Sequence, residues 1–249
     1  MTGSFSELNF YNALTEVEGS KMSEKIKKGD FVEIEYDGSL KNPEMLFDTT
    51  SAEKAKKEGI HSQKMAYGPV TICVGETQLL KGLDESLIDK EIGDHEITLP
   101  PEDAFGKKDA KLMKLVPASI FKKNGIRAER GLQVNIDGAI GTIRTVTGGR
   151  VIVDFNHPFS GKEVIYHVKI IKKIDDKTEQ VKSFLNLALN VKKDAIVIEE
   201  KDGKKTIRID SVIHPELLQH VKDKFARVLP GFKDAEIITK QAESPKKEA

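Results

Sequence analysis

Short segments of the chain alternate apolar and polar residues with a period of two, the pattern of half-buried β-strands. The clearest alternations lie at residues 31–36, FVEIEY, and 164–171, VIYHVKII. The first is followed by an Asp-Gly pair that predicts a turn. Further strand patterns occur at residues 45–48, 70–74, 96–99, 112–116, 132–136, 139–146, 150–155, 195–200, 204–210 and 236–239. The chain is therefore predicted to be rich in strands.

Helical spacing is restricted to a few stretches. Leu83, Leu87 and Ile88 follow Gly82 at i, i+4 and i+5, and Gly93 comes shortly after them. This spacing predicts one short helix with one buried face, and such a helix fills the concave side of a sheet. Other helical patterns occur at residues 50–64, 117–123, 181–189 and 215–229, the last of them amphipathic.

Glycine-containing pairs predict tight hairpins in two parts of the chain. Asp137-Gly138 and Gly148-Gly149 divide residues 106–155 into a meander, and Asp202-Gly203 joins two strands further on. Residues 107–156 contain ten Lys or Arg against four Asp or Glu, a net charge of +6. We expect this segment to attract acidic stretches of another polypeptide, an attraction that salt weakens.

The composition narrows the class of protein. A length of 249 residues predicts two or three compact units. Lys plus Arg and Asp plus Glu both number 40, so no overall field favours nucleic acid, and none is expected as a partner. No apolar run reaches the ~20 residues of a membrane span, so we expect no membrane association and a cytoplasmic location. The single cysteine, Cys73, excludes an internal disulfide and lies in a predicted strand as a buried, inert thiol.

Five motifs occur in a specific order: GDFVEIEYDG, LFDTT, VGETQLLKGLDESL, IGDHEITLPPEDAFG and YHVKIIKKI. This order resembles the FK506-binding-protein (FKBP) family of peptidyl-prolyl cis/trans isomerases, over about residues 27–174. The segment inserted between Gly106 and Asn156, followed by NHPFSGK, is similar to the SlyD-like chaperone-isomerases of bacteria and archaea. The additional C-terminal segment resembles a longer archaeal type.

The resemblance implies an α+β fold, in which an antiparallel FKBP-like sheet wraps a short helix. It also implies a small β-rich inserted domain and a C-terminal α+β domain. The expected bounds are 22–106 with 157–175 for the isomerase domain, 107–156 for the inserted chaperone domain and 176–240 for the C-terminal domain. Residues 1–21 are expected to be an N-terminal extension or tag, and residues 241–249 a disordered tail.

The resemblance also implies a set of site residues. The expected catalytic residues are Tyr36, Phe47, Asp48, Leu80, Phe105 and Tyr166, and the expected substrate-binding residues of the pocket are Leu79, Leu83 and His157. The Leu80 N–H is the expected donor to a substrate carbonyl, and neighbouring hydroxyls are expected to orient Asp48. Leu83 stands where a tryptophan is common, which argues against tight binding of FK506-like macrolides. Phe105 stands where a tyrosine is common, which removes a hydroxyl that could bond to substrate. Taken singly, these aromatic residues are more typical of a core than of a site, and His157 of a structural histidine. Only the joint order of the motifs favours a site.

Prolyl isomerisation requires rotation about an amide bond with a barrier of about 18–20 kcal/mol. A dry aromatic pocket disfavours the planar, more polar amide relative to the twisted state. Such a site needs no nucleophile, so we expect no cofactor and no metal.

The predicted function is isomerisation of Xaa-Pro bonds in unfolded or partly folded polypeptides and proline-containing peptides, with an insert that holds the client. The expected client contacts are Leu112, Met113, Val116, Ile120 and Phe121, about half of which should form the core of the insert. One alternative is a holdase-type chaperone or binding module with little turnover, because Leu83 and Phe105 alter the pocket. Another is assembly, in which the C-terminal domain forms a homodimer through the apolar face of residues 215–229.

Overall fold

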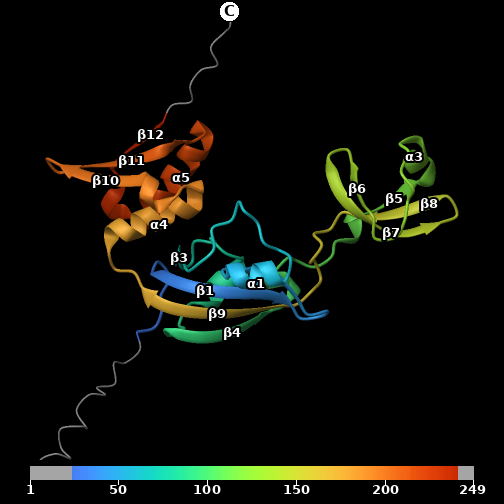
Figure 1. Cartoon of the computed structure of the whole chain (residues 1–249), viewed down its shortest axis with the longest axis horizontal. Coiled ribbons are helices and arrows are strands. Elements are labelled where there is room, and N and C mark those ends of the chain that lie inside the picture. The colour runs from blue at the N-terminus through green and yellow to red at the C-terminus, as the bar shows by residue number, and fades with distance from the viewer. Residues whose placement is uncertain (1–23, 241–249) are drawn as a thin grey trace, which may run out of the picture.

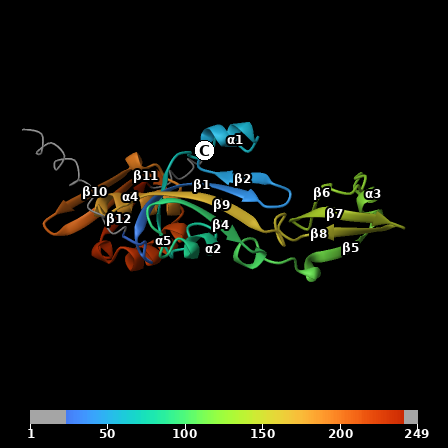
Figure 2. The same cartoon turned by 90° about the horizontal axis from the view of Figure 1, so that it is seen from below.

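The computed structural model describes residues 24–240, so the expected extension at 1–21 and tail at 241–249 lie outside the described residues. The described strands form three sheets (Figures 1 and 2). The buried apolar side chains of the described residues gather in three clusters. The predicted α+β architecture, with an antiparallel sheet on a short helix, is confirmed. None of the helices between residues 24 and 240 has the length and apolar character needed to span a bilayer.

The first sheet has five antiparallel strands around a central pair. They are β1 (Phe31–Leu40), β2 (Met45–Thr49), β3 (Val70–Cys73), β4 (Gly93–Leu99) and β9 (Val164–Lys173). One edge of β1 pairs along its length with β9, whose other edge pairs with β4. The opposite edge of β1 is shared, because β3 pairs with its first half and β2 with its second. The strand β9 therefore lies between β1 and β4 and joins them into one sheet, although it follows the insert in the chain.

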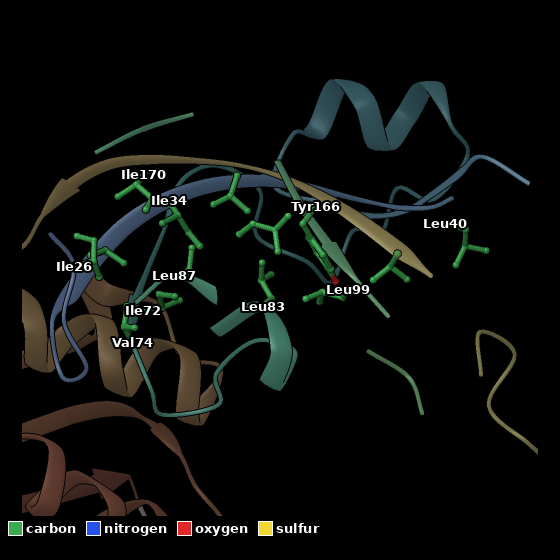
Figure 3. Close-up of a cluster of buried hydrophobic side chains, with 14 residues drawn as sticks. Ile26, Ile34, Leu40, Ile72, Val74, Leu83, Leu87, Leu99, Tyr166 and Ile170 are labelled. Atoms are coloured by element: carbon green, nitrogen blue, oxygen red, sulfur yellow. The ribbon is translucent and has the colours of Figure 1, made fainter. Parts of the chain in front are cut away.

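Two short helices, α1 (Ala52–Lys57) and α2 (Lys81–Ser86), lie on opposite faces of this sheet. On the concave face, α2 contributes Leu83, which is 1% exposed, and is followed by Leu87, which is fully buried. Figure 3 shows these side chains beneath the sheet and α1 on the other side. Ser51 caps α1, because its side chain accepts the Lys54 N–H. The predicted short helix inside a curved sheet is thus present.

The turn predicted at Gly38 is wrong, because β1 continues through it to Leu40. Gly38 pairs with Tyr166 of β9, and the Tyr166 ring lies across the Gly38 backbone. A Cβ at Gly38 would lie 2.6 Å from Tyr166 Cε1 and 3.2 Å from Phe47 Cζ. The glycine is therefore required by a close approach inside the strand and not by a turn.

The insert forms a four-stranded antiparallel sheet with the order β5-β8-β7-β6. Its elements are β5 (Met113–Pro117), α3 (Ala118–Lys123), β6 (Gln133–Ile136), β7 (Ala139–Thr147) and β8 (Arg150–Asp154). Both predicted hairpin turns are confirmed. Asp137 and Gly138 have φ values of 53° and 82°, and Gly148 and Gly149 have 54° and 81°, as a two-residue turn of this hand requires.

The C-terminal unit combines a three-stranded sheet with two helices. Its elements are α4 (Lys177–Leu189), β10 (Ile196–Lys201), β11 (Lys204–Val212), α5 (Pro215–Val228) and β12 (Glu236–Lys240). Helix α5 connects β11 to β12, which pair in parallel. Helix α4 starts four residues earlier than predicted, because Asp176 caps it by accepting the Glu179 N–H at 2.7 Å. Single 3₁₀ turns occur at Pro101–Asp103, Ala110–Leu112, Lys193–Ala195 and Pro230–Phe232.

The C-terminal unit shares its core with the first sheet. Phe31 and Cys73, from β1 and β3, are buried in the same cluster as the apolar side chains of α4 and α5. Strand alternation explains this, because Val32 and Ile72 next to them point into the core of the first sheet. Phe225 of α5 is 2% exposed. The apolar face of α5 that suggested a homodimer is thus covered within the chain at Val221 and Phe225, whereas Leu217 is 43% exposed, and dimerisation stays a prediction.

Candidate active site

Aromatic side chains from distant segments meet on the concave face of the first sheet. Phe47 of β2 lies 5.4 Å from Phe105 and 5.9 Å from Tyr166 between ring centroids, both edge to face. Tyr36 of β1 lies 5.9 Å from Tyr166, also edge to face. Leu83 of α2 belongs to the same buried cluster, and Figure 3 shows it on the same side of the sheet as Tyr166. These contacts are within the range of favourable aromatic pairs.

Asp48 is the charged member of this aromatic cluster. Burial raises the pKa of its carboxyl, and the hydrogen bonds from the Tyr36 hydroxyl and the Thr49 N–H offset this only in part. Burial, together with the nearby Asp48 charge, raises the pKa of both Tyr36 and Tyr166. The Tyr36 hydroxyl therefore stays protonated and donates to Asp48 at neutral pH.

The hydroxyl that bonds to Asp48 is that of Tyr36, whereas the hydroxyls of the two threonines that follow Asp48 bond to β1. Thr49 Oγ1 donates to Asp37 Oδ1 at 2.5 Å, and Thr50 Oγ1 accepts the Tyr36 N–H at 3.0 Å. Both threonines thus bind β1 and fix β2 and the following turn against it. Asp48 is instead held by Tyr36 and the backbone.

A short loop, residues 75–80, carries Leu79 and Leu80 to the edge of this cluster; we call it the pocket loop. Both leucines are partly buried against the core of the first sheet. Asp84 of α2, which is 2% exposed, accepts the Gly75 N–H at 2.9 Å and the Thr77 N–H at 2.6 Å. Asp84 thus orders the pocket loop, a role that its position in a first helical turn did not indicate.

Leu80 stands at the junction of the pocket loop and α2. It is the N-cap residue of α2, and its carbonyl accepts the Asp84 N–H at 2.9 Å. Helix geometry gives the N–H of an N-cap residue no intrahelical acceptor. A substrate carbonyl is a suitable acceptor for this N–H.

The insert leaves and rejoins the first sheet beside the aromatic rings. The exposed ring of His157 stacks on Phe105 with 4.6 Å between centroids and an interplanar angle of 6°. Phe159, which the sequence analysis did not select, lies 5.1 Å from Phe47 and 5.2 Å from Phe105. Ser160 Oγ donates to the Phe105 carbonyl at 3.0 Å, which ties the returning chain to the departing one. The NHPFSGK motif marked this place but not the contacts of its phenylalanine.

The client contacts expected in the insert divide into two groups. Val116 and Phe121 are 8% and 3% exposed and belong to the insert's own core, so they are not available to a client. The remaining three are exposed: Leu112 at 40%, Met113 at 39% and Ile120 at 44%. Leu115 and Ile140, which the sequence analysis missed, are exposed at 58% and 68%.

Leu115 also lines a cavity on the outer face of the insert sheet. This cavity has a volume of about 530 Å³ and includes Ile152, the cross-strand neighbour of Leu115, and Thr145, which pairs with Ile152 from the other side. The alternation of side chains along β5 could have predicted the place of Leu115. With Val116 in the core, Leu115 must point to the other face.

A second cavity, of about 900 Å³, lies beneath α1 on the outer face of the first sheet. Its lining residues are mostly polar or charged and include Asp37, Lys54 and His167, together with Tyr36. Asp37 and His167 alternate along β1 and β9 with Tyr36 and Tyr166, so their side chains point away from the aromatic cluster. The cavity is therefore a different surface, and its size does not make it the isomerase site.

Comparison with known proteins agrees with this arrangement. A family model described as "FKBP-type peptidyl-prolyl cis-trans isomerase" matches residues 22–122, and one described as "FKBP26, IF domain" matches residues 114–159. The short-type peptidyl-prolyl cis-trans isomerase of Methanocaldococcus jannaschii is 32% identical over 146 residues, 58% of this chain and 92% of the relative.

Two bacterial proteins are similar at lower identity. The FKBP-type 16 kDa peptidyl-prolyl cis-trans isomerase of Escherichia coli is 29% identical over 157 residues, 61% of this chain and 95% of the relative. The FKBP-type peptidyl-prolyl cis-trans isomerase SlyD of Helicobacter pylori is 29% identical over 109 residues, 41% of this chain and 58% of the relative. With the sheet, the short helix and the aromatic cluster, these matches show that the chain belongs to the family of FKBP-type, SlyD-like peptidyl-prolyl cis-trans isomerases.

Proposed function

We propose that the chain accelerates rotation about Xaa-Pro bonds in folding polypeptides at the aromatic cluster, while the inserted segment holds the client. The observation that carries the proposal is the convergence of Tyr36, Phe47, Phe105 and Tyr166 around Asp48. The family membership of the chain supports the same activity.

The proposed mechanism needs no covalent step. The rings of Phe47, Phe105 and Tyr166 surround the proline ring and exclude water, which disfavours the planar amide relative to the twisted state. The Leu80 N–H donates to a substrate carbonyl and fixes the pose. The partly buried Asp48, hydrogen-bonded to Tyr36, supplies the negative side of the pocket.

We assign the holding of clients to residues 107–156, as a domain inserted into the isomerase domain. Three features support this role: exposed apolar side chains, a net charge of +6, and connections that start and end beside Phe105 and His157. A polypeptide held there has its prolyl bonds at a high effective concentration near the pocket. The longer archaeal architecture, with residues 176–240 as a further domain, completes the proposed organisation.

The test is the isomerisation rate of a short Xaa-Pro peptide with the wild-type chain, Tyr36→Ala and Asp48→Asn. Both variants should lose about tenfold or more in kcat/KM if these groups act in the pocket. Lys41→Met, which breaks an exposed ion pair with Glu163, is the matched control and should be unchanged. A folded wild-type chain with no rate above background would refute the isomerase proposal.

The second candidate is a holdase with little turnover, favoured by Leu83 and Phe105 at the positions where tryptophan and tyrosine are common. Removing residues 107–156 separates the two candidates. An isomerase would keep its turnover of a short peptide, whereas a holdase would lose suppression of aggregation and has no peptide turnover to retain.

Weaker binding of FK506-like macrolides follows from Leu83, and a titration with Leu83→Trp as the comparison tests it. A homodimer through residues 176–240 is a further proposal, which the mass of the chain in solution decides.

A further inference from the structure

The pocket loop is held from outside by a helix of the C-terminal unit. Arg227 Nη2 of α5 donates to Glu76 Oε2 at 2.7 Å. Lys224 Nζ donates to the backbone carbonyl of Glu76 and lies 3.9 Å from the same carboxylate oxygen. The Glu76 side chain is 13% exposed, whereas that of Arg227 is 69% exposed. Glu76 is therefore the more buried member of this ion pair, and the cations of α5 hold it in place.

The same unit also contacts the base of the pocket loop. Cys73 is 1% exposed and lies in the core formed by α4 and α5. Its N–H donates to Gln78 Oε1 at 2.6 Å, so the strand end and the pocket loop are joined by a side chain. Burial raises the pKa of the Cys73 thiol to about 12, with the Glu76 charge as a further cause. The C-terminal unit thus touches the chain just before the loop and again at its second residue.

The backbone of the pocket loop needs such restraints. Thr77 has φ of 55°, a left-handed conformation that residues other than glycine rarely adopt. Asp84 holds Gly75 and Thr77 from the side of α2, as described above. With Asp84 on one side and α5 on the other, the loop is fixed between two structural units, and Leu80 follows it directly.

We propose that α5 is a positioning element for the isomerase site, in which Arg227 and Lys224 act through Glu76 to hold the backbone that presents the Leu80 N–H. This inference rests on the proposed role of Leu80. A donor displaced by a fraction of an ångström makes a weaker hydrogen bond to the substrate carbonyl in the twisted state. The C-terminal unit therefore contributes to turnover without touching the substrate.

The experiment uses the full chain with Glu76→Gln, Arg227→Met and the conservative Arg227→Lys. Arg208→Met is the matched control, because Arg208 pairs with Glu199 at 3.4 Å within the C-terminal sheet. Three quantities are measured: kcat and KM on a short Xaa-Pro peptide, the reaction rate of Cys73 with Ellman's reagent, and amide hydrogen exchange of Thr77.

The expected result separates positioning from stability. Glu76→Gln and Arg227→Met should lower kcat by about five- to tenfold, with faster exchange at Thr77 and with Cys73 still protected. Arg227→Lys should stay within about twofold of the wild type, because it keeps a cation near Glu76. Arg208→Met should change none of the three quantities.

Two results would overturn the proposal. The first is wild-type kcat in both Glu76→Gln and Arg227→Met. The second is a loss of kcat that occurs only together with faster reaction of Cys73, because this pattern reports undocking of the whole C-terminal unit. A wild-type chain without turnover would refute the proposed function instead, and Thr77 exchange would then still decide whether α5 restrains the loop.

Discussion

Asp154 offers the sharpest test of what holds the insert in place. It is 2% exposed, and one of its oxygens accepts hydrogen bonds from Lys108 at 3.2 Å and Arg144 at 3.0 Å. Its other oxygen accepts the Asn156 N–H at 2.9 Å and Nδ2 at 2.8 Å. Asn156 Oδ1 in turn accepts the Asp109 N–H at 2.8 Å, which joins the departing and returning connections. Asp154→Asn removes the charge while keeping the shape of this junction.

The size of the effect follows from the pKa of Asp154. Burial alone would raise this pKa, but the hydrogen bonds from Asn156, Lys108 and Arg144 outweigh it and lower the pKa from 3.8 to about 2. A folded-state pKa below the unfolded value stabilises the fold above pH ~4, and this stabilisation is lost as the pH falls through about 2. The difference between these two pKa values corresponds to at most about 2.5 kcal/mol, and about 1–2 kcal/mol is expected because Lys108 and Arg144 are partly hydrated.

Urea unfolding of the full chain, followed by circular dichroism and by amide exchange of Val153, measures this contribution. Asp154→Asn should lower the free energy of unfolding of the insert by about 1–2 kcal/mol at pH 7 and by much less at pH 2.5. Asp137→Asn is the matched control, because Asp137 is exposed in a turn that asparagine also favours. Equal effects of the two substitutions at pH 7, or a loss from Asp154→Asn that persists at pH 2.5, would contradict the reasoning.

Three further predictions follow from the described contacts. Gly38→Ala should destabilise the first sheet by about 1–3 kcal/mol and lower peptide turnover, because the new Cβ would meet Tyr166. Thermal unfolding and kcat/KM measure these effects, and a variant with unchanged stability and turnover would refute the close approach. Leu115→Ser should weaken suppression of aggregation but spare peptide turnover, whereas Val116→Ser should unfold the insert, as amide exchange would reveal. Asp176→Ala should cost about 1 kcal/mol through loss of the α4 cap, measured by urea unfolding, and a neutral result would deny the cap its role.

Local patterns predicted the elements that depend on local chemistry. Alternation located β1 and β9, and the Asp137-Gly138 pair located its hairpin because a left-handed turn needs those residue types. The early start of α4 had an available signal, since Asp176 and Glu179 have the spacing of a helix cap followed by an acid. Its omission was an error of interpretation and not a limit of the sequence.

Other features depend on contacts between distant segments, which no local pattern contains. The Asp-Gly pair at Gly38 favours a turn locally, but pairing with Tyr166 determines its actual place in a strand. Phe31 belongs to the core of a unit whose residues come much later in the chain. The candidate pocket residues were named by resemblance, and only the fold brings them together. Phe47 lies on β2 and Phe105 follows the 3₁₀ turn after β4, and these segments meet at one face of the sheet.

The place of β9 in the chain has a consequence for synthesis on the ribosome. Strands β1 and β4 both pair with β9, so the isomerase sheet stays incomplete until the residues of β9 have been made. The insert lies earlier and pairs only within itself, between Met113 and Asp154. Domains tend to fold as units during synthesis, and nearby contacts form faster than distant ones. The insert is thus able to fold first, and in a nascent chain its sheet is finished before the isomerase sheet is.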